Sequence, residues 1–351
     1  MKKNFFNYFI PIILLSLLSL VCIYCSKNVV INYYDFLKKQ SIFLVLGIFL
    51  LFVFRHINFN MIKKYSFLFY LFTLFLLIYV LFWGDSINGS RSWINLFGFS
   101  IQPSEFAKIS LLLCLDKYIH SKFGFLKCLI LVIIPTILTF LQPDTGTVLF
   151  YLVIFFSIFI AMGLKKIYYI VLFSFAGVLI LGYFYLYFFQ SELFIDVFGT
   201  NFFYRTDRII NFMNSEGFQL NNALIGIGNG GLFGNGIKYV IYIPEVITDF
   251  MFSNILTMFG FCGGFIVLVL YLFIDILLIK DIFRINKYKF YVIGLFGLFF
   301  YQQIQHMFMN VGLLPITGIT LPFVSYGGSS LISYYILFGI LLNIKKYHID
   351  T

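Results

Sequence analysis

The sequence predicts an all-α polytopic membrane protein with ten transmembrane helices, a large extracytoplasmic loop between helices 7 and 8, and both termini in the cytoplasm. Composition is the first observation behind this prediction: 61% of the 351 residues are hydrophobic, 22% are aromatic and only 11% are charged. A soluble domain of this length does not bury that much apolar surface. The second observation is the recurrence of apolar runs of about twenty residues, which is the length needed to cross the hydrocarbon core of a bilayer.

Ten candidate spans follow one another along the chain. They lie at about residues 6–25, 41–54, 66–83, 103–118, 128–141, 146–163, 167–189, 251–278, 290–309 and 324–344. The first run follows Lys2-Lys3 and continues to about Tyr24 without a small-residue cleavage site, so we interpret it as a retained span and not as a signal peptide. The second and fifth runs are short and are expected to extend into their flanks. The fourth begins at Pro103, a residue that suits the first turn of a helix.

Charge distribution sets the orientation of these spans. With the N-terminus in the cytoplasm, sixteen Lys and Arg residues fall in the inner segments and seven in the outer ones, as the positive-inside rule requires. The net charge of +10 is explained by cytoplasmic loops that meet anionic membrane lipids, so no nucleic acid partner is expected. We expect one domain, residues 1–351, whose outward-facing segments are 84–102, about 190–250, and 310–323.

A first group of polar residues surrounds the start of the fourth span. Arg91 and Trp93 lie in the preceding outer segment, and Glu105 and Lys108 lie at i and i+3 in the helix, where they share a face. Pairing is expected because an isolated charge at that depth is costly. One interpretation is a helix-start signal with a structural ion pair. The other is the polar wall of a cavity that opens to the outside, with Arg91 and Trp93 at its mouth.

A second polar stretch, Gln142-Pro143-Asp144-Thr145-Gly146-Thr147, joins the fifth and sixth spans. Proline, aspartate and glycine in this order are ordinary turn residues, and we favour that structural interpretation. The alternative is that Asp144 contributes a carboxylate to a shared, outward-facing site.

The long outer loop contains the run Gly226-Ile227-Gly228-Asn229-Gly230-Gly231. Such a run can expose backbone N–H groups to a phosphate, although glycines also let membrane helices pack closely. Arg205, Arg208 and Lys238 in the same loop favour an anionic ligand.

The same loop ends at Asp249, directly before the eighth span. Desolvation there is expected to raise the pKa of Asp249 toward that of a general base, with Glu245 on the same helix face. The alternative for Asp249 is a favourable charge at a helix N-terminus.

A third polar region follows the ninth span. The stretch from Gly312 to Ser330 holds two prolines and four glycines, so a broken helix is predicted there, buried in protein or lining a cavity. His306 and three nearby glutamines form a polar stripe in the preceding span. We favour a hydrogen-bonded packing role for His306 over a catalytic one. Cys22 and Cys25 have C-x-x-C spacing without a second pair, so no metal site is predicted.

Four motifs, read together, resemble those of the SEDS family (shape, elongation, division and sporulation). They occur in order between about Gln40 and Lys346 and read QPSE-x-x-K, PD-x-GT, PE-x-x-TDF and GLLP-x-TG-x-x-LP-x-x-SYGGSS. The resemblance implies a ten-span peptidoglycan glycosyltransferase of the bacterial cytoplasmic (inner) membrane. Such proteins polymerise lipid II on the outer side of that membrane, together with a class B penicillin-binding protein.

Site residues follow from the same resemblance. It implies that Asp249 is the catalytic base, and that Glu105 and Lys108 support the site. Further supporting or substrate-binding residues, by position in the motifs or as candidate cations for the pyrophosphate, are Arg91, Trp93, Asp144, Arg205, Arg208, Lys238, Glu245 and Ser325. No cofactor is implied with certainty, although a divalent cation would be compatible.

Some positions differ from the pattern of the family. Ile247 stands where a histidine is usual, and Thr257-Met258 where an acidic pair often occurs. Within the family, the short tails and Ile316-Thr317-Gly318 favour the RodA branch (elongation), whereas Thr320 and the spelling PEVITDF resemble the FtsW branch (division). We favour the RodA branch.

Two other functions are compatible with the same residues. A lipid II flippase or other transporter would also use broken helices and intramembrane charges, but its key charges should lie near the midplane of the bilayer. A scaffold that only recruits a transpeptidase would not need Asp249.

Overall fold

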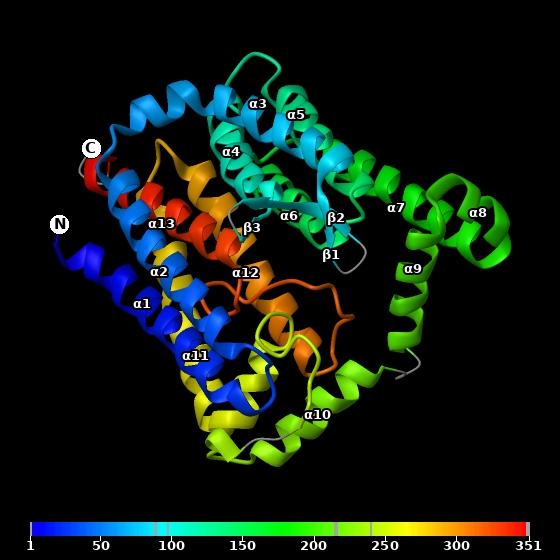
Figure 1. Cartoon of the computed structure of the whole chain (residues 1–351). Helices are drawn as coiled ribbons and strands as arrows, with labels where there is room; N and C mark the ends of the chain where they lie inside the picture. The colour runs from blue at the N-terminus through cyan, green and yellow to red at the C-terminus, as the bar shows by residue number, and fades with distance from the viewer. Residues whose placement is uncertain (1, 88–89, 97, 214–216, 239–240, 349–351) are drawn as a thin grey trace.

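The computed structural model describes residues 2–87, 90–96, 98–213, 217–238 and 241–348. Each of the ten candidate spans falls on a helix of this structure (Figure 1). These helices are α1 (Lys2–Cys25), α2 (Tyr33–His56), α3 (Phe59–Trp83), α4 (Pro103–Tyr118), α5 (Gly124–Leu141), α6 (Thr145–Ala161), α7 (Lys166–Phe189), α11 (Met251–Arg284), α12 (Lys289–Asn310) and α13 (Gly328–His348). The chain is therefore mostly helical, as the sequence predicts.

Six helices in the described ranges are long and apolar enough to cross a membrane: those of α1, α2, α3, α5, α11 and α13. Two shorter apolar helices are α6 and the part of α7 from Gly177 to Phe189. The fourth and ninth expected spans, α4 and α12, are more polar. Most of their side chains are buried by neighbouring helices, which explains how two such polar helices fit in this bundle.

The expectation of an all-α fold is wrong in one place. The segment between α3 and α4 forms a three-stranded antiparallel sheet of β1 (Asp85–Ile87), β2 (Ser90–Leu96) and β3 (Phe99–Ile101). Asp85 pairs with Trp93, and Ile94 pairs with Ile101. Strands this short leave little periodic signal, and cross-strand pairing, which the sequence does not display, stabilises them.

The long segment between α7 and α11 is also more regular than an open loop. It contains α8 (Ser191–Phe198), α9 (Thr200–Met213), α10 (Phe218–Gly230) and the short 3-10 helix η2 (Gly236–Lys238). Aromatic side chains pack α8 and α9 onto the ends of α5 and α7, with the rings of Phe140 and Phe202 stacked at 4.4 Å. Figure 1 shows α8 and α9 to one side of the bundle.

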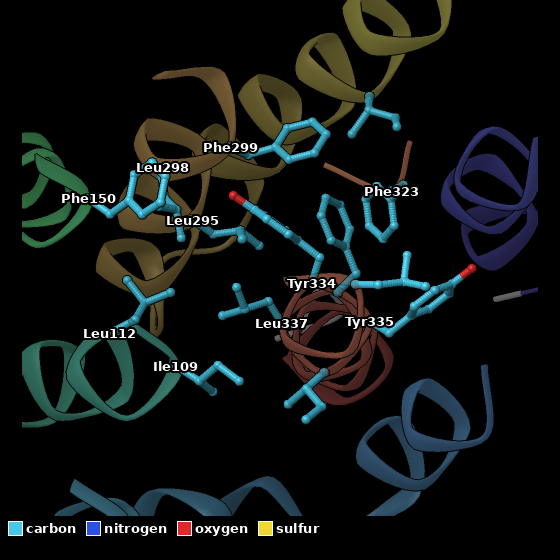
Figure 2. Close-up of a cluster of buried hydrophobic side chains, with 14 of the residues drawn as sticks. Ile109, Leu112, Phe150, Leu295, Leu298, Phe299, Phe323, Tyr334, Tyr335 and Leu337 are labelled. Atoms are coloured by element: carbon cyan, nitrogen blue, oxygen red, sulfur yellow. The ribbon is translucent and has the colours of Figure 1, made fainter. Parts of the chain in front are cut away.

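The core of the bundle surrounds α13. Phe299 of α12 and Phe323, which precedes α13, pack against Tyr334 and the neighbouring rings (Figure 2). On the other side α2 approaches α13 closely, because a Cβ on Gly47 would lie 2.4 Å from the ring of Tyr335. This packing fixes both ends of the non-helical stretch 311–327, hereafter the 311–327 segment, which joins α12 to α13.

The eighth expected span, 251–278, is not one continuous helix. The backbone of Gly260 is non-helical, with φ +65° and ψ −166°, in the middle of α11. A Cβ on Gly264 would lie 2.4 Å from Leu256 and 3.7 Å from Phe252, whereas residues twelve apart in a straight helix are about 18 Å apart. The first part of α11, Met251–Phe259, therefore folds back along the second part, and we call it the return segment.

Candidate active site

Asp249 lies in a loop, residues 244–250, that is hydrogen-bonded to the 311–327 segment. The hydroxyl of Ser325 donates to the carbonyl of Thr248 at 2.7 Å and accepts from the amide of Leu321 at 2.8 Å. The amide of Tyr326 donates to the carbonyl of Ile247 at 2.8 Å. Ser325 therefore has a structural reason for its place in the motif, because its side chain bridges the two loops.

Asn310, the last residue of α12, holds the other side of this loop. Its side-chain amide donates to the carbonyl of Asp249 at 2.9 Å. Its side-chain oxygen accepts from the amide of Ser253 at 2.9 Å and from the hydroxyl of Ser253 at 2.7 Å. Asn310 is not among the site residues predicted from the sequence. Its one signal in the sequence is that it is a polar residue at the boundary of an apolar run.

The carboxylate of Asp249 lies beside the backbone of Gly318. A Cβ on Gly318 would stand 3.7 Å from Oδ2 of Asp249, and φ is +70° at this glycine. Burial, with a smaller contribution from the negative charge of Glu245, raises the pKa of Asp249 to about 7. A carboxylate with such a pKa exists in both protonation states near neutral pH, which suits a general base.

Glu245 does not share a helix face with Asp249, contrary to the expectation. It lies in a turn with φ +52°, and its carbonyl accepts from the amides of Thr248 and Phe250. The hydroxyl of Thr248 donates to Oε2 of Glu245 at 2.8 Å. The left-handed backbone of Glu245 interrupts any helix here, and α11 begins only at residue 251.

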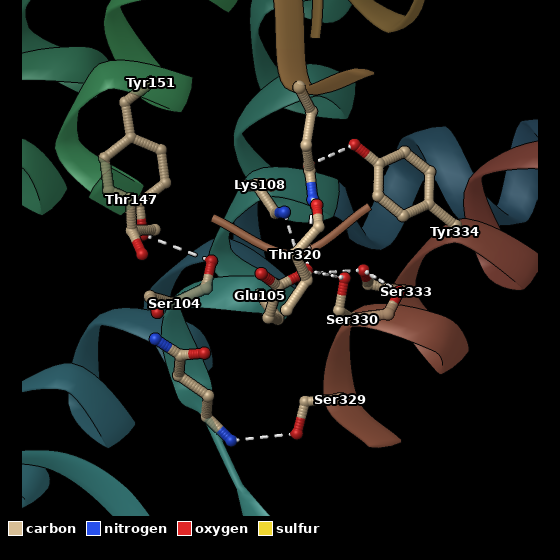
Figure 3. A network of polar contacts seen from close by, with 12 residues as sticks. Ser104, Glu105, Lys108, Thr147, Tyr151, Thr320, Ser329, Ser330, Ser333 and Tyr334 are labelled. Atoms are coloured by element: carbon tan, nitrogen blue, oxygen red, sulfur yellow. Dashed lines mark hydrogen bonds and ion pairs between the residues drawn. The ribbon is translucent and has the colours of Figure 1, made fainter. Parts of the chain in front are cut away.

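The predicted pairing of Glu105 and Lys108 is confirmed. Nζ of Lys108 lies 2.7 Å from Oε2 of Glu105, and both side chains are almost completely buried. The hydroxyl of Ser333 donates to Glu105 at 2.9 Å (Figure 3). The ammonium of Lys108 also faces the rings of Phe150 and Tyr334, whose centroids lie 4.4 and 5.3 Å away.

Asp144 has a structural role at the start of α6, as the favoured interpretation predicts. It is the N-cap of α6, where it accepts from the amide of Thr147 at 3.3 Å and from its hydroxyl at 2.7 Å. The side chain of Gln102 donates to Asp144 at 2.7 Å, so the PD and QPSE motifs are in direct contact. Burial raises the pKa of Asp144, although these hydrogen bonds lower it in part.

The 311–327 segment lies near Asp144 and is hydrogen-bonded to α12 and α13. Near Asp144, a Cβ on Gly146 would lie 3.1 Å from the carbonyl of Thr317. Further along, the carbonyl of Thr320 accepts from Gln302 at 2.7 Å, and its hydroxyl is 3.1 Å from that of Ser330. No hydrogen bond or ion pair of the described residues joins Asp249 directly to Glu105, Lys108 or Asp144. The segment instead lies beside Asp249 at Gly318, and beside Gly146, two residues after Asp144, at Thr317.

Gln40 of α2 is a second residue that was missed as part of the site. Its side-chain nitrogen donates to the carbonyl of Ser325 at 3.3 Å and to the hydroxyl of Ser19 at 3.0 Å. Its side-chain oxygen accepts from the amide of Gly327 at 3.4 Å. The expected second span began at residue 41, which left this buried glutamine outside it.

Of the four cations predicted for the pyrophosphate, the structure describes the side chain of Arg91 alone. Arg91 is exposed on β2 and Trp93 is half-buried. No hydrogen bond or ion pair within the described ranges links Arg91 to Asp249. The backbones of Arg205 and Arg208 lie in α9 and that of Lys238 in η2, while their side chains fall outside the described residues.

The glycine run does not form a phosphate-binding loop. Residues 226–230 are the last turn of α10, so their N–H groups are used within the helix. A Cβ on Gly230 would lie 2.2 Å from the carbonyl of Leu256 in α11. Close packing, the other interpretation of these glycines, is therefore correct.

His306 is a packing residue, as favoured. Its Nδ1 lies 2.7 Å from the carbonyl of Ile319, and its Nε2 accepts from the amide of Phe252 at 3.4 Å. Within the described part of the chain, no group of three or more His, Cys, Asp or Glu residues could hold a metal ion.

Comparison with known proteins gives relatives over almost the whole chain. The probable peptidoglycan glycosyltransferase FtsW of Wigglesworthia glossinidia brevipalpis is 34% identical over 351 residues, covering 90% of this chain and 87% of the relative. Stage V sporulation protein E of Bacillus subtilis (strain 168) is 33% identical over 381 residues, covering 99% of this chain and 98% of the relative.

Solved structures show the same fold. A chain of a peptidoglycan synthase complex superposes with a TM-score of 0.81 at 23% identity, covering 99% of this chain and 97% of the other. The rod shape determining protein RodA of Thermus thermophilus superposes with a TM-score of 0.70 at 25% identity, covering 98% and 97%. A family of cell cycle proteins, FTSW_RODA_SPOVE, matches residues 5–349. The chain therefore belongs to the FtsW/RodA/SpoVE family of cell cycle proteins.

Proposed function

We propose that this protein is a peptidoglycan glycosyltransferase that polymerises lipid II on the outer side of the bacterial cytoplasmic membrane, with Asp249 as general base. The observation that carries the proposal is the environment of Asp249. Burial raises the pKa of its carboxyl to about 7, and its backbone carbonyl is held by Asn310, at the end of α12 that is expected to face outward. The name of the relative FtsW, a probable peptidoglycan glycosyltransferase, supports the same activity.

The reaction joins two lipid-linked disaccharides. A sugar hydroxyl of the acceptor attacks the anomeric carbon of the donor and gives its proton to the carboxylate of Asp249. The bond from that carbon to the pyrophosphate breaks, and polyprenyl pyrophosphate leaves with the electron pair. The sequence offers Arg91, Arg205, Arg208 and Lys238 as the cations that stabilise this leaving group.

In this proposal the remaining site residues position the loops of the site and supply buried charge beside them. Glu105, Lys108 and Asp144 form a buried polar wall beside the 311–327 segment, and Ser325 fastens that segment to the loop of Asp249. Trp93, half-buried on β2, lies in the outer sheet that precedes this wall. We assign all ten helices that match candidate spans to the membrane, with a class B penicillin-binding protein as partner.

The decisive experiment incubates the purified protein with lipid II, with and without a class B penicillin-binding protein, and scores glycan polymer on a gel. Wild-type protein is expected to give polymer, and Asp249→Asn to give at least a hundredfold less with unchanged folding and partner binding. Full polymerisation by Asp249→Asn would show that Asp249 is not the general base. Transfer of lipid II across vesicle membranes without formation of polymer would show that the protein is a flippase and not a glycosyltransferase.

The branch of the family is a finer question. Ile316-Thr317-Gly318 favours elongation, whereas the similarity to FtsW favours division. We retain elongation as the role to test. Expression in rod-shaped bacteria depleted of either RodA or FtsW is expected to restore rod shape in the first strain. Rescue of division alone would assign the protein to the FtsW branch.

A further inference from the structure

A short strap of backbone fills the break in α11. The strap, Gly230–Asn235, follows α10 and runs past Gly260. The amides of Phe261 and Cys262 donate to the carbonyls of Gly231 and Leu232 at 2.9 and 3.1 Å. From the strap, the amide of Asn235 donates to the carbonyl of Thr257 at 3.0 Å.

These three hydrogen bonds replace bonds that the helix itself cannot make. A helix leaves its first amides and last carbonyls without intrahelical partners, and Gly260 creates one such end on each side of it. Unsatisfied backbone groups are costly next to hydrocarbon, so the break needs an external partner. The strap supplies that partner with backbone atoms alone.

Glycines make the close approach possible. A Cβ on Gly234 would lie 2.2 Å from the carbonyl of Met258, and a Cβ on Gly260 would lie 2.4 Å from that of Leu232. Both residues also have a left-handed φ, +80° and +65° respectively. Any larger residue at either position would strain the backbone and push the strap away from α11.

The break bears on the site because the return segment directly follows Asp249. Ser253 of the return segment shares the side chain of Asn310 with Asp249, and Phe252 donates to His306. The connection after α1 anchors the same region: Asn254 donates to Ser26 at 3.0 Å, and Asn28 donates to the carbonyl of Ile237 at 2.8 Å. Movement of the strap would therefore move the return segment, which begins two residues after Asp249.

We infer that the strap is a backbone splint, and that Gly234 and Gly260 are positioning residues that set the place and burial of Asp249 through the return segment. This inference rests on the proposed function for its kinetic consequences, but the splint itself is a property of the backbone. The splint also gives a structural role to Gly230 and Gly231, the part of the glycine run that lies in the strap. Thr257 and Met258, which differ from the usual acidic pair, supply the carbonyls that the strap meets.

The test compares Gly234→Ala and Gly260→Ala with Gly228→Ala, an exposed glycine of α10 whose Cβ would meet no atom within 4 Å. Amide hydrogen exchange of residues 251–262 is measured in purified full-length protein in nanodiscs. Polymerisation of lipid II is measured as kcat, KM and pH profile per folded molecule. In the two test variants, exchange of 251–262 is expected to rise roughly tenfold or more. We also expect kcat to fall about tenfold or more with KM within about threefold.

The pH profile separates positioning from general damage. A displaced return segment exposes Asp249, so the midpoint of the acid limb is expected to fall below about 7 in both test variants but not in Gly228→Ala. Asn28→Ala removes the exposed hydrogen bond to Ile237 of η2, which directly follows the strap. It is expected to change exchange and pH midpoint in the same direction but less, and it keeps the inference testable if the glycine variants do not fold.

Two results would overturn the splint: exchange of 251–262 equal to that of Gly228→Ala, or reduced kcat with an unchanged pH midpoint. In exchange and kcat, the double variant Gly234→Ala/Gly260→Ala should be affected no more than the poorer single variant, because both substitutions disrupt the same contact between the strap and α11. If wild-type protein made no polymer, the proposed function would fail, and the exchange measurement would still decide the splint.

Discussion

Asn310 donates a hydrogen bond of 2.9 Å from its side-chain amide to the backbone carbonyl of Asp249, and its side-chain oxygen accepts from Ser253. One side chain thus holds both the residue proposed as base and the helix that follows it. Since a buried amide with all its partners satisfied stabilises a unique arrangement, Asn310 should matter for both folding and catalysis.

We expect Asn310→Ala to lower the free energy of unfolding by about 1–3 kcal/mol and polymerisation of lipid II by at least about tenfold. The matched control is Asn343→Ala, because Asn343 of α13 is also buried and donates to the carbonyls of Phe54 and Ile57. That variant should show a similar loss of stability, measured by thermal unfolding in detergent, with normal activity per folded molecule. Equal activities in the two variants would contradict the role of Asn310.

The pH dependence of polymerisation should follow Asp249. A general base works in its deprotonated form, so activity should rise as pH increases through about 7. The negative charge of Glu245 contributes to the raised pKa of Asp249, and its removal should lower that pKa. We therefore expect Glu245→Gln to shift the acid limb to lower pH and to raise the ratio of activity at pH 6 to that at pH 8. Glu192→Gln, at an exposed position of α8, is the control that should leave the ratio unchanged.

Gln40 should be as important as the motif residue that it holds. Gln40→Ala leaves the carbonyl of Ser325 and the amide of Gly327 without this partner, which is expected to cost about 1–3 kcal/mol of stability and to reduce polymerisation. Its neighbour Ser41 only donates to the carbonyl of Leu37 within α2, so Ser41→Ala should have little effect on either quantity. Wild-type kinetics in Gln40→Ala would show that the 311–327 segment keeps its place without α2.

Sequence patterns predicted the helices because apolar length is a local property. Positions 103–118 and 166–189 were found to within one residue, and the pairing of Glu105 with Lys108 followed from their spacing. The return segment was not predicted, because the reversal at Gly260 depends on backbone contacts with a strap about thirty residues earlier. A glycine within an apolar run does not reveal whether it packs two helices or ends one of them.

The site shows the same division. Asp249 and Asp144 lie in recognisable motifs, but the partners that orient them, Asn310 and Gln102, come from other elements of the fold. Glu245 was misplaced because spacing of four residues implies a shared face only if the intervening backbone is helical. Here it is a turn with a left-handed residue.

The buried pair of Glu105 and Lys108 offers a last prediction, because it separates structural from functional charge. Removing one member leaves an uncompensated buried charge, so Lys108→Met should lower the free energy of unfolding by about 3–5 kcal/mol. The double variant Glu105→Gln/Lys108→Met should regain most of that stability. If these charges also act on substrate, its polymerisation activity should remain at least about tenfold below that of the wild type.

The control for this cycle is a second buried pair, Lys345 and Asp281, at the end of the bundle expected to face the cytoplasm. Their Nζ and Oδ2 atoms lie 2.6 Å apart, and Tyr8 also donates to this carboxylate at 2.7 Å. Asp281→Asn/Lys345→Met should recover both stability and polymerisation relative to Lys345→Met, because no catalytic role is proposed for that pair. Full activity of Glu105→Gln/Lys108→Met would instead make the first pair structural only, and polymer yield per folded molecule is the measurement that decides between the two.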